Sequence, residues 1–255
     1  MVMELEICVD SVESASAAAS GGADRIELCS ALSEGGITPS AGLIRAVRES
    51  AGIPLYVIIR PRGGNFVYSE LELDVMRRDI VTARAQGVDG VVLGVLKQDN
   101  TVNKVRTKEL VELARPMQVT FHRAFDTCPD LGKALEDVIA CGADRLLTSG
   151  GRTAASKALK TIASLNSQAG RRVRIMAGGG VRLGNVRTIA LRTGVREVHT
   201  SLSTTVKSTA YDGGADANGL HGGFTQFVVR EDDVRKFKAA LGEIAMESGA
   251  RAPIQ

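Results

Sequence analysis

Histidine is scarce in this chain, and one of its three histidines lies in a short polar stretch, FHRAFD, at residues 121–126. His122 is followed directly by Arg123, and Asp126 comes three residues later. An imidazole exchanges a proton near neutral pH, and a guanidinium can hold a carboxylate or a phosphate. The stretch is therefore a candidate for acid–base chemistry or anion binding, provided that the fold brings it to a pocket.

Arginine and glycine recur at the ends of several strand-like runs. RPRGGNF (60–66) supplies two arginines, and TSGG (148–151) and AGGGV (177–181) are rich in glycine. Glycine-rich strand ends expose backbone N–H groups that can surround an anion, although such segments can equally be tight turns without a ligand. The expected anion-binding residues are Arg60, Arg62, Arg123, Gly150, Gly178 and Gly179.

The four cysteines, Cys8, Cys29, Cys128 and Cys141, show no CxxC spacing, so the sequence does not indicate a structural zinc site. Cys8 and Cys29 lie on strand-like runs that follow one another, and two thiolates suit a soft ion such as Cu(I). Small buried cysteines are also common core residues. The first pair is thus a candidate metal site, whereas Cys128 and Cys141 are interpreted as structural.

One pattern occurs four times along the chain. Each copy has a glycine, a small or branched apolar residue, a polar residue and then a strand-like run. The glycine is typical of a residue that ends a helix, and a strand usually begins within a few residues of it. Four further β-branched runs lie between the copies. The copies are GGADRIEL (21–28), QGVDGVVL (86–93), CGADRLLT (141–148) and TGVREVHT (193–200), and the other runs are 5–10, 55–61, 117–123 and 173–180.

Eight strands that alternate with helices over 255 residues indicate a single (β/α)8 barrel domain, residues 1–255. An open doubly wound sheet is the alternative, but it usually has a glycine-rich fingerprint after its first strand, and residues 11–20 have none. Residues 202–230 predict a long loop, and about 231–248 predict a C-terminal helix. Within the barrel, Thr38 with Pro39 predicts a helix start, and Ser69 with Glu72 predicts a capping box.

Alternation along the strands predicts that many polar side chains point into the barrel. Barrel interiors are normally filled by branched apolar residues, so this interior is unusual. A structural ion-pair network of Glu6, Arg25, Glu27 and Arg60 is one explanation, and a site at the C-terminal ends of the strands is another. The residues expected to face inward are Glu6, Cys8, Asp10, Arg25, Glu27, Cys29, Ile58, Arg60, Thr120, His122, Glu197, His199 and Ser201.

If the interior is an active site, Glu27 and His122 are the candidate general acid and base, and Arg60 is a third candidate catalytic residue. The three arginines and the glycines at the strand ends would then hold the substrate. The class of substrate would be a small anionic or phosphorylated metabolite.

Composition excludes several other roles. The net charge is +3 and the chain has no tryptophan, which argues against nucleic-acid binding. No apolar run approaches the roughly 18 residues of a membrane helix, and MVMELEICVD at the start lacks the apolar core of a signal peptide. We therefore expect a cytoplasmic protein without a membrane partner.

Long blocks of the sequence closely resemble the CutC family of copper homeostasis proteins, from about residue 4 to residue 205. The resemblance implies a (β/α)8 barrel, Cu(I) binding at Cys8 and Cys29, and a homodimer or homotetramer. Residues that match the family's polar pocket are Glu27, Arg60, His122 and Arg123. The blocks are ELEICVDSVESA (4–15), 21–40 apart from Ile37, 59–69 apart from Asn65 and Val67, VTFHRAFD (119–126), RLLTSGG (145–151) and MAGGGV (176–181).

Two hypotheses stay open at this point. The first is a cytosolic Cu(I)-binding protein of copper homeostasis, and the second is an enzyme that acts on a small anion, with copper incidental. They do not exclude one another, because the same barrel opening would serve both.

Overall fold

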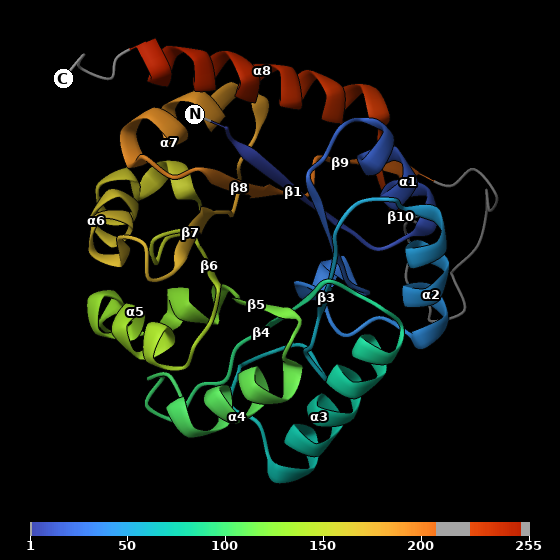
Figure 1. Cartoon of the computed structure of the whole chain (residues 1–255), viewed down its shortest axis with the longest axis vertical. Helices are drawn as coiled ribbons and strands as arrows, with labels where there is room; N and C mark the ends of the chain where they lie inside the picture. The colour runs from blue at the N-terminus through green and yellow to red at the C-terminus, as the bar shows by residue number, and fades with distance from the viewer. Residues whose placement is uncertain (1, 208–224, 251–255) are drawn as a thin grey trace.

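The computed structural model describes residues 2–207 and 225–250, and it contains a closed barrel of eight parallel strands (Figure 1). Neighbouring strands follow the order of the sequence, and the last strand pairs with the first. The expected (β/α)8 barrel is confirmed. The strands are β1 (Glu4–Val9), β2 (Arg25–Leu28), β3 (Leu55–Ile58), β4 (Gly90–Leu93), β5 (Gln118–Phe121), β6 (Arg145–Thr148), β7 (Arg174–Ala177) and β8 (Glu197–Thr200).

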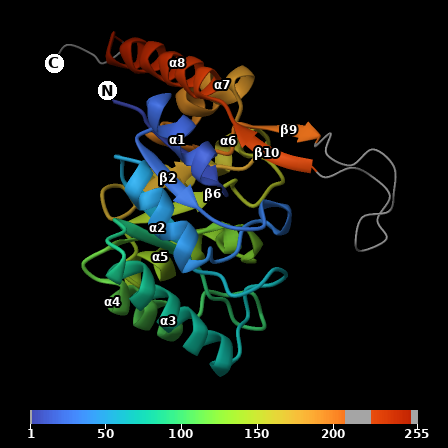
Figure 2. The same ribbon diagram turned by 90° about the vertical axis from the view of Figure 1, so that its right-hand side faces the viewer.

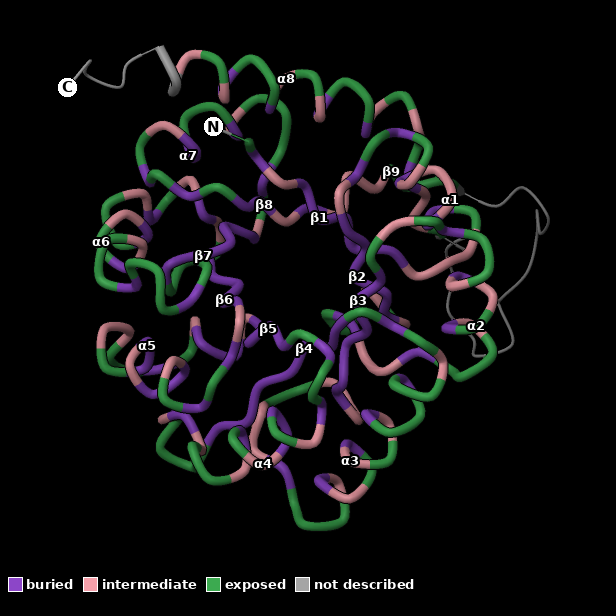
Figure 3. The backbone as a smooth tube through the Cα atoms, in the orientation of Figure 1, coloured by how far each residue is buried: buried purple, intermediate pink, exposed green. Residues whose placement is uncertain are grey.

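Helices surround the barrel, and the apolar core lies between them and the outward faces of the strands (Figure 3). The predicted capping box of Ser69 and Glu72 precedes the third helix. Among the described residues, none of the helices combines the length and apolar character that crossing a bilayer requires. The helices are α1 (Val12–Ser20), α2 (Ala41–Ser50), α3 (Glu70–Ala85), α4 (Lys104–Ala114), α5 (Leu131–Ala140), α6 (Leu159–Ala169), α7 (Leu183–Thr193) and α8 (Glu231–Ala250), with 3-10 turns η1 (Leu32–Glu34), η2 (Arg123–Thr127) and η3 (Ala155–Lys157).

The predicted helix start at Thr38 is wrong. Helix α2 begins at Ala41, and the Ser40 hydroxyl caps it by accepting a hydrogen bond from the Leu43 N–H at 3.2 Å. The Thr38 hydroxyl instead accepts a hydrogen bond from the backbone N–H of Arg60 at 2.9 Å. Thr38 therefore joins the segment after β2 to the end of β3, at the edge of the barrel opening.

The four repeated segments join a helix to the strand that follows it, and a glycine with positive φ lies in each. In three of them the shared position of the aspartate has a physical reason that the sequence alone does not reveal. The aspartate accepts a hydrogen bond from a backbone N–H of the preceding strand, and so fixes the start of two adjacent strands. The pairs are Asp24 with Leu5 (2.7 Å), Asp89 with Leu55 (2.8 Å) and Asp144 with Val119 (2.7 Å).

The region expected to be one long loop, 202–230, contains two strands at its ends. β9 (Ser203–Lys207) and β10 (Thr225–Val229) pair in antiparallel fashion and extend away from the barrel (Figure 2). The part of the expected loop between them, 208–224, lies outside the described residues. Helix α8 begins at Glu231, where the C-terminal helix was expected to start, and packs across α1 and α7.

Candidate functional site

The inward side chains nearest the N-terminal ends of the strands form a buried ionic cluster, here called the lower layer: Glu6, Arg25, Tyr56, Arg145 and Glu197. The Arg25 guanidinium contacts both Glu6 and Glu197, and the Arg145 guanidinium also contacts Glu197. Both guanidinium groups lie over the Tyr56 ring, at 5.0 and 5.4 Å from its centre. The charges thus neutralise one another.

A structural ion-pair network therefore explains only two of the four inward residues for which it was considered. Glu6 and Arg25 belong to the lower layer, whereas Glu27 and Arg60 do not take part in it. They lie nearer the C-terminal ends of the strands, where the barrel opens into a pocket.

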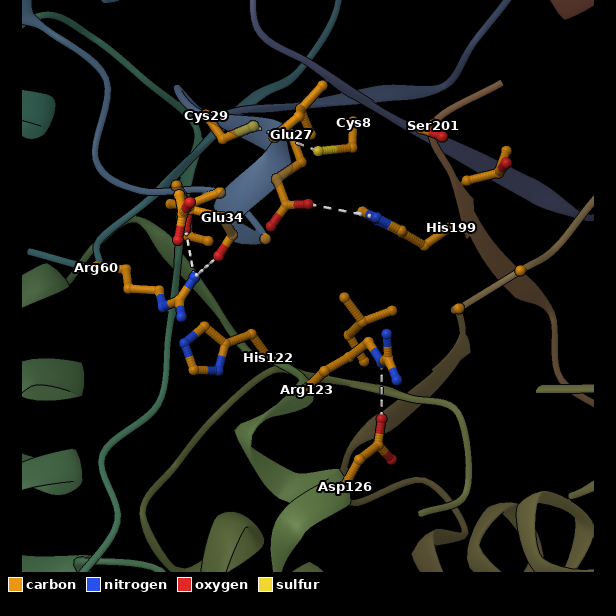
Figure 4. A pocket seen from close by; sticks show the side chains of 18 of the residues that line it. Cys8, Glu27, Cys29, Glu34, Arg60, His122, Arg123, Asp126, His199 and Ser201 are labelled. Atoms are coloured by element: carbon orange, nitrogen blue, oxygen red, sulfur yellow. Dashed lines mark hydrogen bonds and ion pairs between the residues drawn. The ribbon is translucent and has the colours of Figure 1, made fainter. Parts of the chain in front are cut away.

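This pocket has a volume of about 650 Å³ and is lined by residues on or after every barrel strand except β4 (Figure 4). Six of its inward side chains carry the groups considered below, and are here called the upper layer: Cys8, Glu27, Cys29, Arg60, His122 and His199. All six were expected to point inward from strand alternation. The structure brings them together around one cavity.

The two thiols of the upper layer lie side by side. The Cys8 and Cys29 sulfurs are 3.6 Å apart, both residues are buried, and neither forms a disulfide. The hydrogen bond with Cys29, burial and the neighbouring Glu27 raise the pKa of Cys8 well above its ordinary value. Two neighbouring cysteine sulfurs on the wall of an open pocket can take up a soft metal ion, with release of protons.

His199 lies between two carboxylates. Its Nδ1 is 2.7 Å from Glu6, and its Nε2 is 3.4 Å from Glu27. Burial alone would lower the pKa of His199, but the charge of Glu27 and the hydrogen bond to Glu6 outweigh it, and the pKa is raised. Burial raises the pKa of Glu27 itself. His199 and Glu6 can therefore share a proton, and Glu27 faces the other ring nitrogen at the pocket wall.

Glu6 connects the two layers. Burial opposes its ionisation, but Arg25 and the His199 contact lower its pKa to about 2. One of its oxygens is held by Arg25 and the other accepts from His199. The lower layer thereby fixes the orientation of a histidine in the upper layer.

His122 lies at the end of β5 and caps η2, where its Nδ1 accepts a hydrogen bond from the Ala124 N–H at 3.3 Å. The His122 ring packs against Gly94, where a β-carbon would come within 2.6 Å of the ring atoms. The centres of the His122 and Phe66 rings are 4.9 Å apart. Burial, together with the charge of Arg60, lowers the pKa of His122 to about 3. The imidazole is therefore neutral at physiological pH, and because Nδ1 accepts from Ala124, its proton lies on Nε2.

The structure places Arg60 at the pocket, but its guanidinium is largely used by the protein. It donates to the carbonyl oxygens of Glu34, Gly36 and Gly64 at 2.8–2.9 Å, and it lies over the Phe66 ring at 5.1 Å. Those carbonyls belong to the loops after β2 and β3. Arg60 thus shapes the rim of the pocket, and three of its N–H donors are committed to backbone carbonyls rather than to an anion.

Arg62 lies outside the pocket lining. Its guanidinium binds Glu72 at 2.5 Å and the Val67 carbonyl at 2.8 Å, and lies over the Tyr68 ring at 5.2 Å. The structure does not bring it to the other expected anion-binding residues.

Arg123 and Asp126, from the stretch FHRAFD, do reach the pocket, and they build its wall between β5 and β6. Asp126 accepts hydrogen bonds from the Thr148 hydroxyl (2.5 Å), the Ser149 N–H (2.9 Å) and the Gly151 N–H (3.0 Å), and pairs with Arg123 Nε at 2.8 Å. Because Asp126 gathers these donors, the Arg123 guanidinium is held at the cavity edge.

The three glycines expected to bind an anion differ in the structure. The Gly150 N–H donates to the Thr148 hydroxyl at 2.8 Å, and the Gly178 N–H donates to the Thr148 carbonyl at 3.0 Å. Gly179 lines the pocket with Gly180, and neither of their N–H groups has an acceptor within the described part of the chain. Gly179 and Arg123 therefore remain the best-placed anion donors of the expected set.

Sequence reasoning placed His199 inside the barrel but did not select it as a site residue. Its importance depends on closure of the barrel, which pairs β8 with β1 and sets Glu6 directly opposite His199. On the other side of β1, the register with β2 sets Cys8 opposite Glu27. The available signal was the shared inward parity of Glu6 and His199, combined with the adjacency of the first and last strands.

Comparison with known proteins identifies the family. The CutC family model matches residues 3–204. A CutC family protein of Chromobacterium violaceum is 50% identical over 204 residues, which cover 80% of this chain and 83% of that protein. The human copper homeostasis protein cutC homolog is 48% identical over 201 residues, covering 79% of this chain and 74% of that protein.

A solved structure agrees with this assignment. The crystal structure of a CutC protein from Streptococcus agalactiae superposes with a TM-score of 0.75 at 34% identity, covering 78% of this chain and 99% of that one. The region matched by the family model, residues 3–204, includes all eight barrel strands and the residues of both layers. From its sequence and its barrel alike, this chain belongs to the CutC family.

Proposed function

We propose that the protein binds Cu(I) as cargo between Cys8 and Cys29, in the cytosol, as its contribution to copper homeostasis. The observation that carries the proposal is the 3.6 Å separation of the two sulfurs on the wall of an open pocket. Sulfur ligands are those that Cu(I) prefers, and a reducing cytosol keeps them as thiols.

The environment of the pair supports binding of an exchangeable ion. Both residues border the pocket, so an ion can arrive from solvent without unfolding of the barrel. The two cysteines form a small buried cluster with Tyr56, Ile58 and Val92, and such surroundings suit a soft ion of low charge.

Competition for Cu(I) against a chelator of known affinity tests this proposal under anaerobic conditions. Cys8→Ser and Cys29→Ser should each weaken Cu(I) binding at least about tenfold, since each removes one of two sulfur ligands. Cys128→Ser is the matched control, because Cys128 is also buried but lies away from the pocket. Equal affinities in all four proteins would contradict the proposal.

A second function, catalysis on a small anionic or phosphorylated metabolite, is favoured by the size of the pocket. About 650 Å³ is far more than one ion needs and falls in the range of small-molecule sites. Arg123 with the N–H groups of Gly179 and Gly180 would hold the anion, and Glu27, His122 and His199 supply groups for proton transfer.

Thermal unfolding with a panel of phosphorylated metabolites tests this second function. A true ligand should raise the melting temperature of the parent, and Arg123→Ala should remove most of the shift. Arg62→Ala, which changes an arginine outside the pocket, should retain it. Absence of any shift across the panel would count against catalysis on such a substrate.

Assembly into a dimer or tetramer stays a prediction from the family resemblance. Light scattering coupled to gel filtration measures the mass of the particle directly. A mass of two or four chains would support the prediction, and a particle of 26.9 kDa would contradict it.

A further inference from the structure

Three ligating groups of different chemistry meet on one wall of the pocket. The Cys8 sulfur, a Glu27 carboxylate oxygen and the His199 ring nitrogen lie within 4.8 Å of one another. They come from adjacent strands, because β1 pairs with β2 on one side and with β8 on the other, and Figure 4 shows Glu27 and His199 pointing toward each other beside Cys8. Across residues 2–207 and 225–250, no other group of three such side chains is close enough to share an ion.

The orientation of His199 favours a role as a ligand. A carboxylate can only accept, so the ring donates Nδ1–H to Glu6 at 2.7 Å and directs Nε2 toward Glu27 and Cys8. A metal ion that binds there displaces any proton from Nε2 and uses its lone pair. Glu6 is held in turn by Arg25. A carboxylate behind the far nitrogen is the usual arrangement for a histidine that binds a metal.

The spacing between Glu27 and His199 points the same way. Their 3.4 Å separation is long for a hydrogen bond between a ring nitrogen and a carboxylate. Two ligands about 2.0–2.1 Å from one tetrahedral ion would lie roughly 3.3–3.4 Å apart. The observed distance therefore suits two groups that share an ion better than two groups that bind each other.

Charge also selects the class of ion. A Cys8 thiolate and a Glu27 carboxylate carry two negative charges, and a divalent cation would neutralise them at a buried site. Zinc takes mixed sulfur, nitrogen and oxygen ligands, whereas Cu(I) prefers sulfur alone. We propose that Cys8, Glu27 and His199 form a site for a divalent cation of the zinc class, with Glu6 positioning His199 and the remaining coordination position facing the pocket.

This site shares Cys8 with the Cu(I) site, but the proposal of a divalent site does not depend on the proposal of Cu(I) binding. The two ions would compete, because the Cys8 sulfur serves both. The divalent site requires His199 and Glu27, whereas the Cu(I) site requires Cys29. The two proposals can therefore fail separately.

Titration of the whole chain with Co²⁺ tests the divalent site, since tetrahedral Co²⁺ bound to a thiolate has visible and near-ultraviolet absorption that Zn²⁺ lacks. The parent should bind one Co²⁺ per chain with these bands, and one equivalent of Zn²⁺ should abolish them. Failure of the bands to appear, or bands that saturate without dependence on Cys8, would overturn the proposal.

Single substitutions assign the ligands. His199→Ala and Glu27→Gln should each weaken Co²⁺ binding at least about tenfold, the minimum seen when even an outer partner of a ligand is removed. His199→Ala should leave Cu(I) affinity unchanged, and Glu27→Gln should not weaken it, because loss of the Glu27 charge eases deprotonation of the Cys8 thiol. Cys29→Ser should weaken Cu(I) binding and leave Co²⁺ binding unchanged, and Cys128→Ser should affect neither ion. Parent-like Co²⁺ binding by folded His199→Ala would contradict the proposal.

A measurement on the parent protein avoids any folding defect in the variants. X-ray absorption at the zinc edge of the Zn²⁺-loaded chain should give a shell with one sulfur and lighter ligands, including imidazole scattering. A shell with no sulfur, or with sulfur and no imidazole, would overturn the assignment.

Discussion

The lower and upper layers of the barrel interior are built from alternate residues of the same strands, yet they differ in what their side chains do. In the lower layer, Arg25 and Arg145 are neutralised by Glu6 and Glu197, and no ligand is needed to complete the set. In the upper layer, thiols, a carboxylate and imidazoles border about 650 Å³ of space. The difference shows that a polar barrel interior is not by itself evidence of function, because the decisive feature is whether its charges are satisfied internally.

The two layers are also coupled through a single residue. Glu6 belongs to the lower layer by its contact with Arg25 and orients His199 in the upper layer. A rigid ionic layer beneath a reactive one holds the reactive groups in place without occupying the cavity.

Glu197→Gln should have the largest effect, because it breaks the lower layer. It leaves the buried guanidinium groups of Arg25 and Arg145 without their shared carboxylate, and removal of one partner of a buried ion pair costs about 3–5 kcal/mol. Urea denaturation of parent and variant measures the loss. A loss below about 1 kcal/mol would mean that the lower layer is not the structural element described here.

Asp126→Asn should have the next largest effect, because it disturbs the scaffold of the upper layer. The buried carboxylate accepts from Thr148, Ser149 and Gly151, and an amide nitrogen in its place would face donors. We expect a loss of about 1–3 kcal/mol. Asp89→Asn is the matched control: its side chain is 47% exposed, so its loss in the same denaturation experiment should be smaller. Equal losses would contradict this comparison.

His122 should make the protein sensitive to acid. The pKa is about 6.5 in an unfolded chain and about 3 in the fold, so between these values the unfolded state binds more protons. The stability is complete above about pH 6.5 and falls as the pH decreases toward 3.

Between pH 6 and 4.5 the parent should lose about 2 kcal/mol more stability than His122→Asn, which lacks the titrating ring and keeps an acceptor for the Ala124 N–H. Denaturation at both pH values measures the difference. Parallel pH profiles would show that His122 is not buried in its neutral form.

Glu27→Gln, measured without added metal, should have the smallest effect on stability. It is the same chemical change as Glu197→Gln, at a residue of similar burial in the upper layer. Burial already raises the pKa of Glu27, so a neutral side chain there removes little, and we expect a change of less than about 1 kcal/mol. Similar losses for Glu27→Gln and Glu197→Gln would remove the distinction between the layers.

Strand alternation made much of this interior predictable. A parallel strand covered by helices must turn its apolar residues outward, so the inward parity of Glu6, Cys8, Glu27, Cys29 and His122 follows from the sequence. Parity could not separate the two layers, because depth along the barrel axis depends on the register between strands. The register between β1 and β8, which sets Glu6 opposite His199, exists only when the barrel closes.

The anion-binding residues were harder to predict, because acceptors within the protein compete with an anion for each N–H donor. Arg60 and Arg62 have the right chemistry for an anion, but backbone carbonyls and Glu72 occupy their guanidinium groups. Gly150 and Gly178 have the right flexibility, but their N–H groups already donate within the turns. A sequence identifies which groups can bind a ligand, and the fold decides which of them remain free.

Anomalous diffraction at the copper edge, from crystals of the Cu(I)-loaded protein, tests the central claim most directly. The claim that the upper layer is a ligand site predicts one strong peak between the Cys8 and Cys29 sulfurs. A peak at Cys128 or Cys141, or no ordered copper in the barrel, would contradict it.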